Sequence, residues 1–254
     1  MRIGLQLPHF RPSTPRTMRS WLKDTVQTVD QGGFDSLWVM DHFFQLGGWL
    51  GEPETEMIEG YTTLGFFAGL TENVKIGLMV GGVIYRHPAL VIKMISTLDV
   101  LTGGRTYFGI GAAWNEQETT SLGMRFPPTK ERFEQLEDIL QIAKHMWSGD
   151  TSIYQGQHFQ LPYPVNNPQP LSKPHPPILI GGMGPKKTLR FVAKYGDACN
   201  FFGGADDDVL LERIEVLKEH CQALDRPYEE IEKTVLQTAN LEDGSAQDVI
   251  NRGV

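Results

Sequence analysis

Residues 34–43 read Phe-Asp-Ser-Leu-Trp-Val-Met-Asp-His-Phe, an apolar run that ends in two ionisable residues. The run 36–40 has the length and the β-branched and aromatic content of a buried strand. Asp41 and His42 follow it directly, at the carboxyl end of the strand. This end is where parallel α/β folds gather their chemically active side chains. The stretch therefore predicts one strand of a parallel sheet with a candidate site at its end.

Similar runs recur along the chain and alternate with stretches of helical periodicity, such as 130–147. Seven strands are expected, at 3–7, 36–40, 74–80, 105–110, 177–180, 198–202 and 232–237. This alternation is the pattern of βα units around a parallel sheet, which is satisfied by a doubly wound sheet or by a (β/α)₈ barrel. Candidate residues follow the second, fourth and fifth strands, and only a barrel brings all strand ends onto one rim. We therefore favour the barrel.

Segment 148–176 interrupts the alternation with a run rich in Tyr, Gln, Asn and Pro. We interpret it as an insertion after the fourth unit, within a single barrel domain that spans residues 1–254. Leu241 and the residues after it contain no apolar run long enough for a buried strand. The eighth βα unit is therefore expected to be incomplete.

Composition excludes several classes of protein. The 254 residues contain 23 Lys plus Arg and 31 Asp plus Glu, a net charge of −8, and no basic block, which argues against nucleic-acid binding. Cys199 and Cys221 lack redox-pair spacing, the seven histidines lack metal-ligand spacing, and no apolar run is long enough to span a membrane. The expectation is a cytoplasmic protein without a metal site or a membrane segment.

A second candidate site is the glycine-rich turn after the fifth strand. Gly181, Gly182, Met183 and Gly184 precede a helix start, and Lys186 adds a positive charge. Free backbone amides at a helix start favour an anion such as a phosphate. The alternative is an ordinary glycine-rich βα turn with surface lysines, and neither the dinucleotide nor the Walker spacing is present.

The other candidates also have structural alternatives. His42 either transfers a proton or bonds a backbone carbonyl. After the fourth strand, Gly111 and Ala113 leave room for a bulky ligand beside Asn115, or else they serve close packing with Trp114 in the core.

Six motifs in order carry a resemblance to a known family: Phe34-Asp-Ser-Leu-Trp-Val-Met-Asp-His-Phe, Val74-Lys-Ile-Gly-Leu-Met-Val, Tyr85-Arg-His-Pro-Ala, Leu101-Thr-Gly-Gly-Arg, Gly109-Ile-Gly-Ala-Ala-Trp-Asn-Glu and Ile178-Leu-Ile-Gly-Gly. Together they resemble the bacterial luciferase-like family, and within it the coenzyme F420-dependent oxidoreductases. The resemblance covers residues 1–237. It implies a (β/α)₈ barrel, a deazaflavin or flavin across the carboxyl-end rim, hydride transfer and a homodimer.

The resemblance also implies roles for individual residues. His42 matches the histidine that faces the reactive ring, with Asp41 as its companion. Met79 and Val80 match a non-proline cis peptide behind the ring. Asn115 and the glycine turn 181–184 match the positions that hold the ribityl phosphate of the cofactor.

Departures from the family pattern narrow the choice of substrate class. The sugar-phosphate dehydrogenases have a glutamate where this chain has Ala113 and a tryptophan where it has Leu46, so a sugar phosphate is disfavoured. Six aromatic residues are candidates for an apolar substrate wall: Phe43, Phe44, Trp49, Trp114, Phe202 and Tyr154. We therefore expect a small hydrophobic substrate. Two alternatives stay open, an FMN-dependent monooxygenase and a barrel that binds flavin without turnover.

Overall fold

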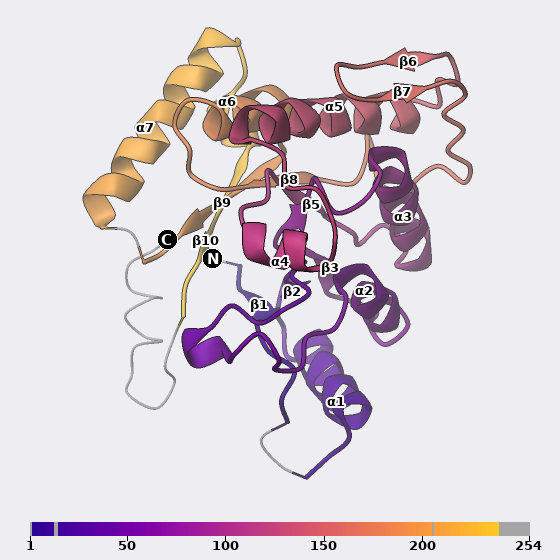
Figure 1. Ribbon diagram of the computed structural model, residues 1–254, viewed down its shortest axis with the longest axis vertical. Coiled ribbons are helices and arrows are strands. Elements are labelled where there is room, and N and C mark those ends of the chain that lie inside the picture. The colour runs from indigo at the N-terminus through magenta and orange to yellow at the C-terminus, as the bar shows by residue number, and fades with distance from the viewer. Residues whose placement is uncertain (1, 13–14, 205, 239–254) are drawn as a thin grey trace. The chain divides into compact units, whose positions relative to one another are not determined.

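The protein is described by a computed structural model that covers residues 2–12, 15–204 and 206–238 (Figure 1). Two compact units make up the chain, one from Arg2 to Pro177 and one that begins at Ile178. The prediction of a single domain stays a prediction.

The first unit alternates strands and helices as predicted. Its strands are β1 (Gly4–Leu7), β2 (Ser36–Val39), β3 (Lys75–Leu78), β4 (Gly81–Gly82) and β5 (Phe108–Gly111), and its helices are α1 (Met18–Gln31), η1 (Gly48–Leu50), α2 (Gly60–Ala68), α3 (Pro88–Leu101), α4 (Glu116–Ser121) and α5 (Thr129–Trp147). Strands β1, β2 and β3 pair side by side in parallel, and β4 pairs in parallel with β5. A bridge between Ile76 and Thr106 connects β3 with the segment that leads into β5.

The strands of this unit lie in the core. All four residues of β2 and of β5 are buried, as expected of parallel strands that are covered on both faces. Position 109 in β5 requires a glycine for steric reasons, because a Cβ atom there would lie 1.8 Å from the carbonyl oxygen of Leu78. Helix α5 contributes the predicted apolar stripe, in which Leu136, Ile139 and Leu140 are buried.

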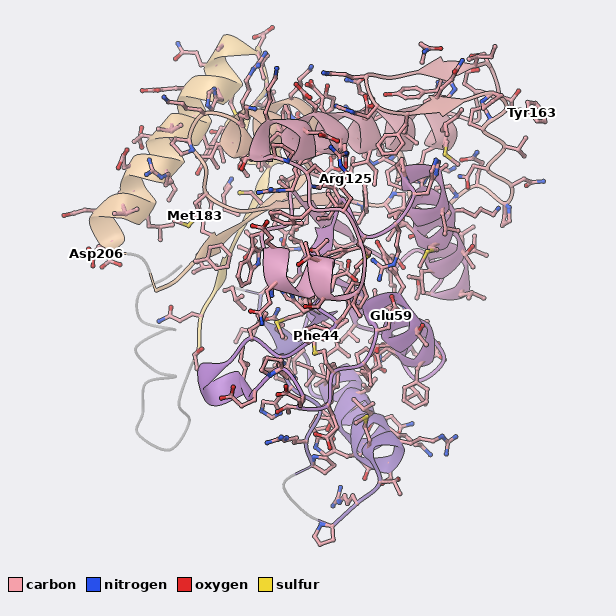
Figure 2. The ribbon with its side chains drawn as sticks, viewed as in Figure 1. Phe44, Glu59, Arg125, Tyr163, Met183 and Asp206 are labelled. Atoms are coloured by element: carbon pink, nitrogen blue, oxygen red, sulfur yellow. The ribbon has the colours of Figure 1, made fainter. Side chains whose placement is uncertain are left out.

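The insertion 148–176 contains a small antiparallel hairpin that the sequence did not predict, β6 (Tyr154–Gln155) with β7 (Gln160–Leu161). Asp138 of α5 holds it, because its carboxylate accepts the backbone N–H groups of Gln157 at 3.0 Å and Phe159 at 3.2 Å. Beyond the hairpin, Tyr163 is 72% exposed and projects outward (Figure 2). Strands of two residues are too short for a periodicity to reveal them.

The second unit contains the strands β8 (Ile178–Gly181), β9 (Ala198–Phe202) and β10 (Glu232–Leu236), which pair in parallel in that order. Its helices are α6 (Thr188–Tyr195), α7 (Asp207–Ala223) and η2 (Tyr228–Glu230). All seven predicted strands are therefore confirmed, with β4, β6 and β7 as additional short strands of the first unit. The expectation of an incomplete eighth unit falls on residues 239–254, which lie outside the described residues.

Within the described part of the chain, no helix combines the length and the apolar character that crossing a membrane requires.

Candidate functional site

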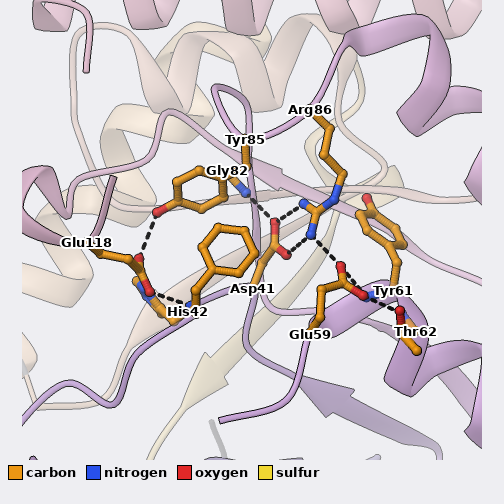
Figure 3. A network of polar contacts seen from close by, with 10 residues as sticks. Asp41, His42, Glu59, Tyr61, Thr62, Gly82, Tyr85, Arg86 and Glu118 are labelled. Atoms are coloured by element: carbon orange, nitrogen blue, oxygen red, sulfur yellow. Dashed lines mark hydrogen bonds and ion pairs between the residues drawn. The ribbon is translucent and has the colours of Figure 1, made fainter. Parts of the chain in front are cut away.

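Two successive residues after β2 direct their side chains into different polar clusters (Figure 3). We call the first the Arg86 cluster, which consists of Asp41, Glu59, Gly82 and Arg86. Both carboxylate oxygens of Asp41 accept from the Arg86 guanidinium at 2.8 Å, and one also accepts the Gly82 N–H at 3.0 Å. A second carboxylate, that of Glu59, contacts the same guanidinium. The cluster therefore joins the ends of β2 and β4 to the start of α2.

Burial and the positive charge of Arg86 act in opposite directions on the two carboxylates of the Arg86 cluster. The Asp41 side chain is 2% exposed, and burial raises its pKa, while the bidentate contact with Arg86 opposes that shift. For Glu59, burial also raises the pKa, but hydrogen bonds from Thr62 and the charge of Arg86 outweigh it and leave the pKa below its ordinary value. The Tyr61 ring lies 4.7 Å from the guanidinium carbon and covers it.

The second cluster, here the Glu118 cluster, consists of His42, Glu118, Tyr85 and the backbone of Phe43 and Phe44. His42 Nδ1 lies 2.9 Å from Glu118 Oε2, which also accepts the Tyr85 hydroxyl at 3.0 Å. The other oxygen, Oε1, accepts the backbone N–H groups of Phe43 and, at 2.9 Å, of Phe44. A single buried carboxylate thus holds the loop after β2 and the imidazole ring together.

These contacts fix the charge and the tautomer in the Glu118 cluster. Glu118 is fully buried, and burial raises its pKa, but the hydrogen bonds from His42 and from the Phe44 and Phe43 amides lower it below its ordinary value. An ionised carboxylate only accepts, so Nδ1 of His42 carries the hydrogen. The other ring nitrogen, Nε2, has no hydrogen-bond partner among the described residues. His42 can therefore accept or release a proton at Nε2.

A short loop and helix α4 bring Glu118 to this place. Ala113 adopts a left-handed conformation with φ 59°, which is uncommon for a residue with a side chain and is typical of functional loops. Asn115 then begins α4 as its N-cap, because its side-chain oxygen accepts the Glu118 N–H at 3.1 Å. Trp114 lies between them, 65% exposed, with its ring edge-on to the His42 ring at 5.5 Å.

The predicted partnership of Asp41 with His42 is not found. Asp41 pairs with Arg86 and Gly82, and Glu118 takes the place beside the imidazole. The catalytic role given to Asp41 stays a prediction, and its contacts are those of a residue that holds the strand end in place.

The remaining predicted cofactor positions of the first unit lie at the ends of β3 and β5. The peptide between Met79 and Val80 is cis, as predicted. Gly111 is buried, and its carbonyl oxygen accepts the N–H of Val83 at 3.0 Å. Their contact with a cofactor stays a prediction, as does that of Ala113 and Asn115.

The glycine turn belongs to the second unit and is considered on its own. Gly182 has φ 110°, a conformation that favours glycine, and Met183 turns its sulfur toward the Phe202 N–H at 3.1 Å. Helix α6 begins at Thr188 without a side-chain cap hydrogen bond, but its second residue, Leu189, donates its N–H to the carbonyl oxygen of Gly184 at 3.1 Å, so this amide is already bonded within the turn. Gly181 and Gly184 flank this turn.

Sequence reasoning missed Glu118, Arg86, Glu59 and Tyr85. One signal was present, since Asn115 and Glu118 have the spacing of a capping box, although that motif predicts only a helix start. The predicted substrate wall also needs a correction. Tyr154 is 8% exposed, and its hydroxyl lies 3.4 Å from the Asp138 carboxylate, so it belongs to the base of the hairpin. The side chain of Trp49 lies outside the described part.

Three comparisons place the chain among known proteins. It is 27% identical over 246 residues to the F420-dependent glucose-6-phosphate dehydrogenase of Kineococcus radiotolerans, covering 95% of this chain and 70% of the relative. The coenzyme F420-dependent tetrahydromethanopterin reductase of Methanopyrus kandleri has a similar structure, with a TM-score of 0.77, 17% identity, and coverage of 94% of this chain and 66% of that one. The oxygenating constituent of 3,6-diketocamphane monooxygenase from Pseudomonas putida, in complex with FMN, gives a TM-score of 0.72, 22% identity, and coverage of 92% and 66%.

The two structural matches confirm the predicted fold class, the luciferase-like α/β barrel, for nearly the whole chain. The chain spans about two thirds of the length of these proteins. A family model described as luciferase-like monooxygenase matches residues 1–247. The motifs around His42, the βα order and this match together establish that the chain belongs to the luciferase-like monooxygenase family.

Proposed function

We propose that this protein is an oxidoreductase that uses coenzyme F420 to transfer hydride to or from a small hydrophobic substrate. One observation carries the proposal. His42 is held through Nδ1 by a buried carboxylate, and its Nε2 atom has no hydrogen-bond partner among the described residues. The similarity to an F420-dependent dehydrogenase and an F420-dependent reductase supports the choice of cofactor.

The residues present fit a deazaflavin that carries a phosphate. In the second unit, Gly182 is in a glycine-favouring conformation, α6 begins without a side-chain cap, and Lys186 is exposed beside them. These donors suit a phosphate group. In the first unit, Gly111 and Ala113 offer little side-chain bulk beside Asn115. When bound, the deazaflavin supplies the two-electron hydride chemistry, and the protein supplies binding, orientation and proton handling.

The chain's own residues divide this work. His42 Nε2 accepts or donates the proton that accompanies hydride transfer. Glu118 keeps the hydrogen on Nδ1 and offsets the positive charge that forms when Nε2 is protonated. The Trp114 ring lies edge-on to the imidazole at 5.5 Å and offers apolar surface beside it, which favours a hydrophobic substrate.

A second candidate is an FMN-dependent monooxygenase. The structural similarity to a monooxygenase in complex with FMN favours this alternative. Both candidates place a tricyclic ring on the same barrel, so the bound cofactor distinguishes them. A homodimer is proposed from the family resemblance alone, and a cytoplasmic location is proposed from the cysteine content of the sequence.

The test combines cofactor titration with one substitution. We expect coenzyme F420 to bind more tightly than FMN, and His42→Ala to lower turnover by about 10²–10⁴-fold with enones, imines or ketones as substrates. The Kd for the cofactor should change by less than about threefold, because the proposed phosphate contacts lie elsewhere. His158→Ala, on the hairpin, is the matched control and should behave as wild type.

Each contrary result has a distinct meaning. Tighter FMN binding, with oxygen consumption during turnover, would replace the proposal by the monooxygenase. Binding of either cofactor without turnover on any substrate class would support the flavin-binding barrel. A loss in His42→Ala that is confined to cofactor affinity would make His42 a ring-positioning residue.

A further inference from the structure

A pocket of about 310 Å³ opens at the amino ends of β3 and β5, at the opposite end of these strands from Met79 and Ala113. Lys75 is the first residue of β3, and Arg105 and Tyr107 lie in the segment that leads into β5. Lys173 and His175, from the end of the insertion, complete the lining. This end of an α/β barrel ordinarily serves stability rather than chemistry. A pocket with a strong charge there needs its own explanation.

The lining of this pocket, which we call the cation pocket, carries three permanent positive charges and no Asp or Glu. Among the residues that the structure describes, Arg105 is bound only to neutral acceptors, namely the Thr71 carbonyl at 2.7 Å, the Thr71 hydroxyl at 3.2 Å and the Val74 carbonyl. Its charge is therefore not balanced by a carboxylate. Lys173 is exposed and has no ion pair within the described ranges.

Two nearby acids compensate this charge only in part. Asp35 lies 3.5 Å from the Lys75 ammonium group and also 3.9 Å from the guanidinium of Arg2. Asp99 is fully buried behind the pocket, where its carboxylate accepts the Ser172 hydroxyl at 2.7 Å and the Ser172 N–H at 2.8 Å. Asp35 is thus shared between two cations, and Asp99 is occupied by the pocket wall.

The walls of the cation pocket are held in place by aromatic contacts. The His175 ring stacks on Trp147 at 5.4 Å with an interplanar angle of 19°. On the other side, the Lys75 ammonium lies 5.7 Å from the centre of the Tyr107 ring, and this ring contacts Trp38 at 5.1 Å. Positive charges on a rigid wall require little ordering when a ligand binds.

The negative net charge of the whole chain makes this local excess of positive charge more significant. At −8, the protein repels anions in general, so an anion can bind only where cations are concentrated. The volume admits an inorganic phosphate with room for a small organic group.

We propose that the cation pocket binds a small molecule that carries a phosphate group. The site is independent of the proposed hydride transfer, because none of its residues belongs to the Arg86 cluster, the Glu118 cluster or the glycine turn. Lys173 and Arg105 provide the uncompensated charge, and the His175 and Tyr107 rings form the walls.

The experiment is a calorimetric titration of the full chain with inorganic phosphate and with glycerol phosphate, at constant ionic strength and with acetate as the reference anion. We expect Lys173→Glu to weaken phosphate binding by at least about tenfold, because it reverses an uncompensated charge at the pocket. Lys23→Glu, on the exposed face of α1, makes the same change of net charge elsewhere and should leave binding unchanged. Because the glycine turn is itself proposed to hold a phosphate, the titration is repeated in Lys186→Ala, where adding Lys173→Glu should weaken the remaining binding by the same factor.

Three results would overturn the proposal. The first is phosphate binding that is lost in Lys186→Ala but kept in Lys173→Glu, which would assign the ion to the glycine turn. The second is an equal loss in Lys23→Glu and Lys173→Glu, which would mean general charge attraction. The third is the absence of saturable binding in wild type. Histidine NMR gives a second measurement, since the His175 imidazole signal should shift with phosphate in wild type and in Lys186→Ala.

Discussion

The Arg86 cluster and the Glu118 cluster begin at successive residues after the same strand, yet they differ in whether a polar atom remains without a hydrogen-bond partner among the described residues. In the first, both oxygens of Asp41 are bound to Arg86 and the residue is almost inaccessible to solvent. In the second, Glu118 is equally buried, but the histidine that it holds keeps one nitrogen without a partner among the described residues. The comparison separates a cluster that holds the fold from one that can do chemistry.

The difference begins with where the two side chains point. Asp41 and His42 follow β2, and although they are adjacent their side chains enter different surroundings (Figure 3). Asp41 meets an arginine that is itself fixed between two carboxylates and an aromatic ring. His42 meets a carboxylate on one side and the exposed Trp114 on the other.

The largest effect should come from breaking the closed cluster. Arg86→Ala leaves the Asp41 carboxylate buried without its counter-charge, which should lower the free energy of unfolding by about 3–5 kcal/mol. Arg16→Ala, which removes an exposed pair with Asp24, is the control and should cost less than about 1 kcal/mol. Urea unfolding measures both. Similar losses in the two variants would show that the Arg86 cluster is not what holds this strand end.

A smaller effect is expected from Glu118→Gln, which weakens the hold on the imidazole without removing it. Turnover should fall by about 10–100-fold, as when a group that orients a functional histidine is replaced, and cofactor affinity should be retained. The pH profile of turnover should also shift, because the neutral amide no longer stabilises the protonated ring. Glu116→Gln, on the exposed side of the same helix, is the control. An unchanged pH profile would contradict the orienting role.

The same variant predicts a dependence of stability on pH. The pKa of Glu118 is lower in the folded protein than the ordinary value of 4.5, so the contribution of its charge to stability is fully present above pH 4.5. It is lost as the pH falls below that value toward the folded pKa. The difference in unfolding free energy between wild type and Glu118→Gln should therefore shrink on acidification. A difference that stays constant from pH 7 to low pH would argue against an ionised Glu118.

The smallest effect should come from Tyr85→Phe. The substitution removes one of the hydrogen bonds to Glu118 and keeps the ring, which contacts Phe43 edge-on at 5.0 Å. We expect a loss of about 0.5–1.5 kcal/mol in stability and a modest change in turnover. Tyr163→Phe, on the exposed insertion, should have no effect on either. A turnover loss in Tyr85→Phe as large as in His42→Ala would make the tyrosine a proton donor in its own right.

Local patterns allowed much of the fold to be predicted, and only part of the site. Buried parallel strands have continuous apolar runs, so their positions are visible in a single sequence. The partners of a side chain are not visible in this way. Glu118 lies 76 positions after His42, and Arg86 lies 45 positions after Asp41. Only the folded chain brings these partners together. The sequence also does not reveal that the side chains of two adjacent residues, such as Asp41 and His42, point in different directions.

Helix α4 also sets a register for the site. The residue that starts the helix, Asn115, and the residue that holds the imidazole, Glu118, are three positions apart, so a single helical turn determines where the carboxylate points. One residue inserted between them would rotate Glu118 by about 100° around the helix axis. The carboxylate would then leave the His42 ring and the Phe43 and Phe44 amides at the same time. This turn should therefore tolerate substitutions better than insertions or deletions. A homologue that keeps the histidine but lacks this spacing must orient the imidazole ring by other means.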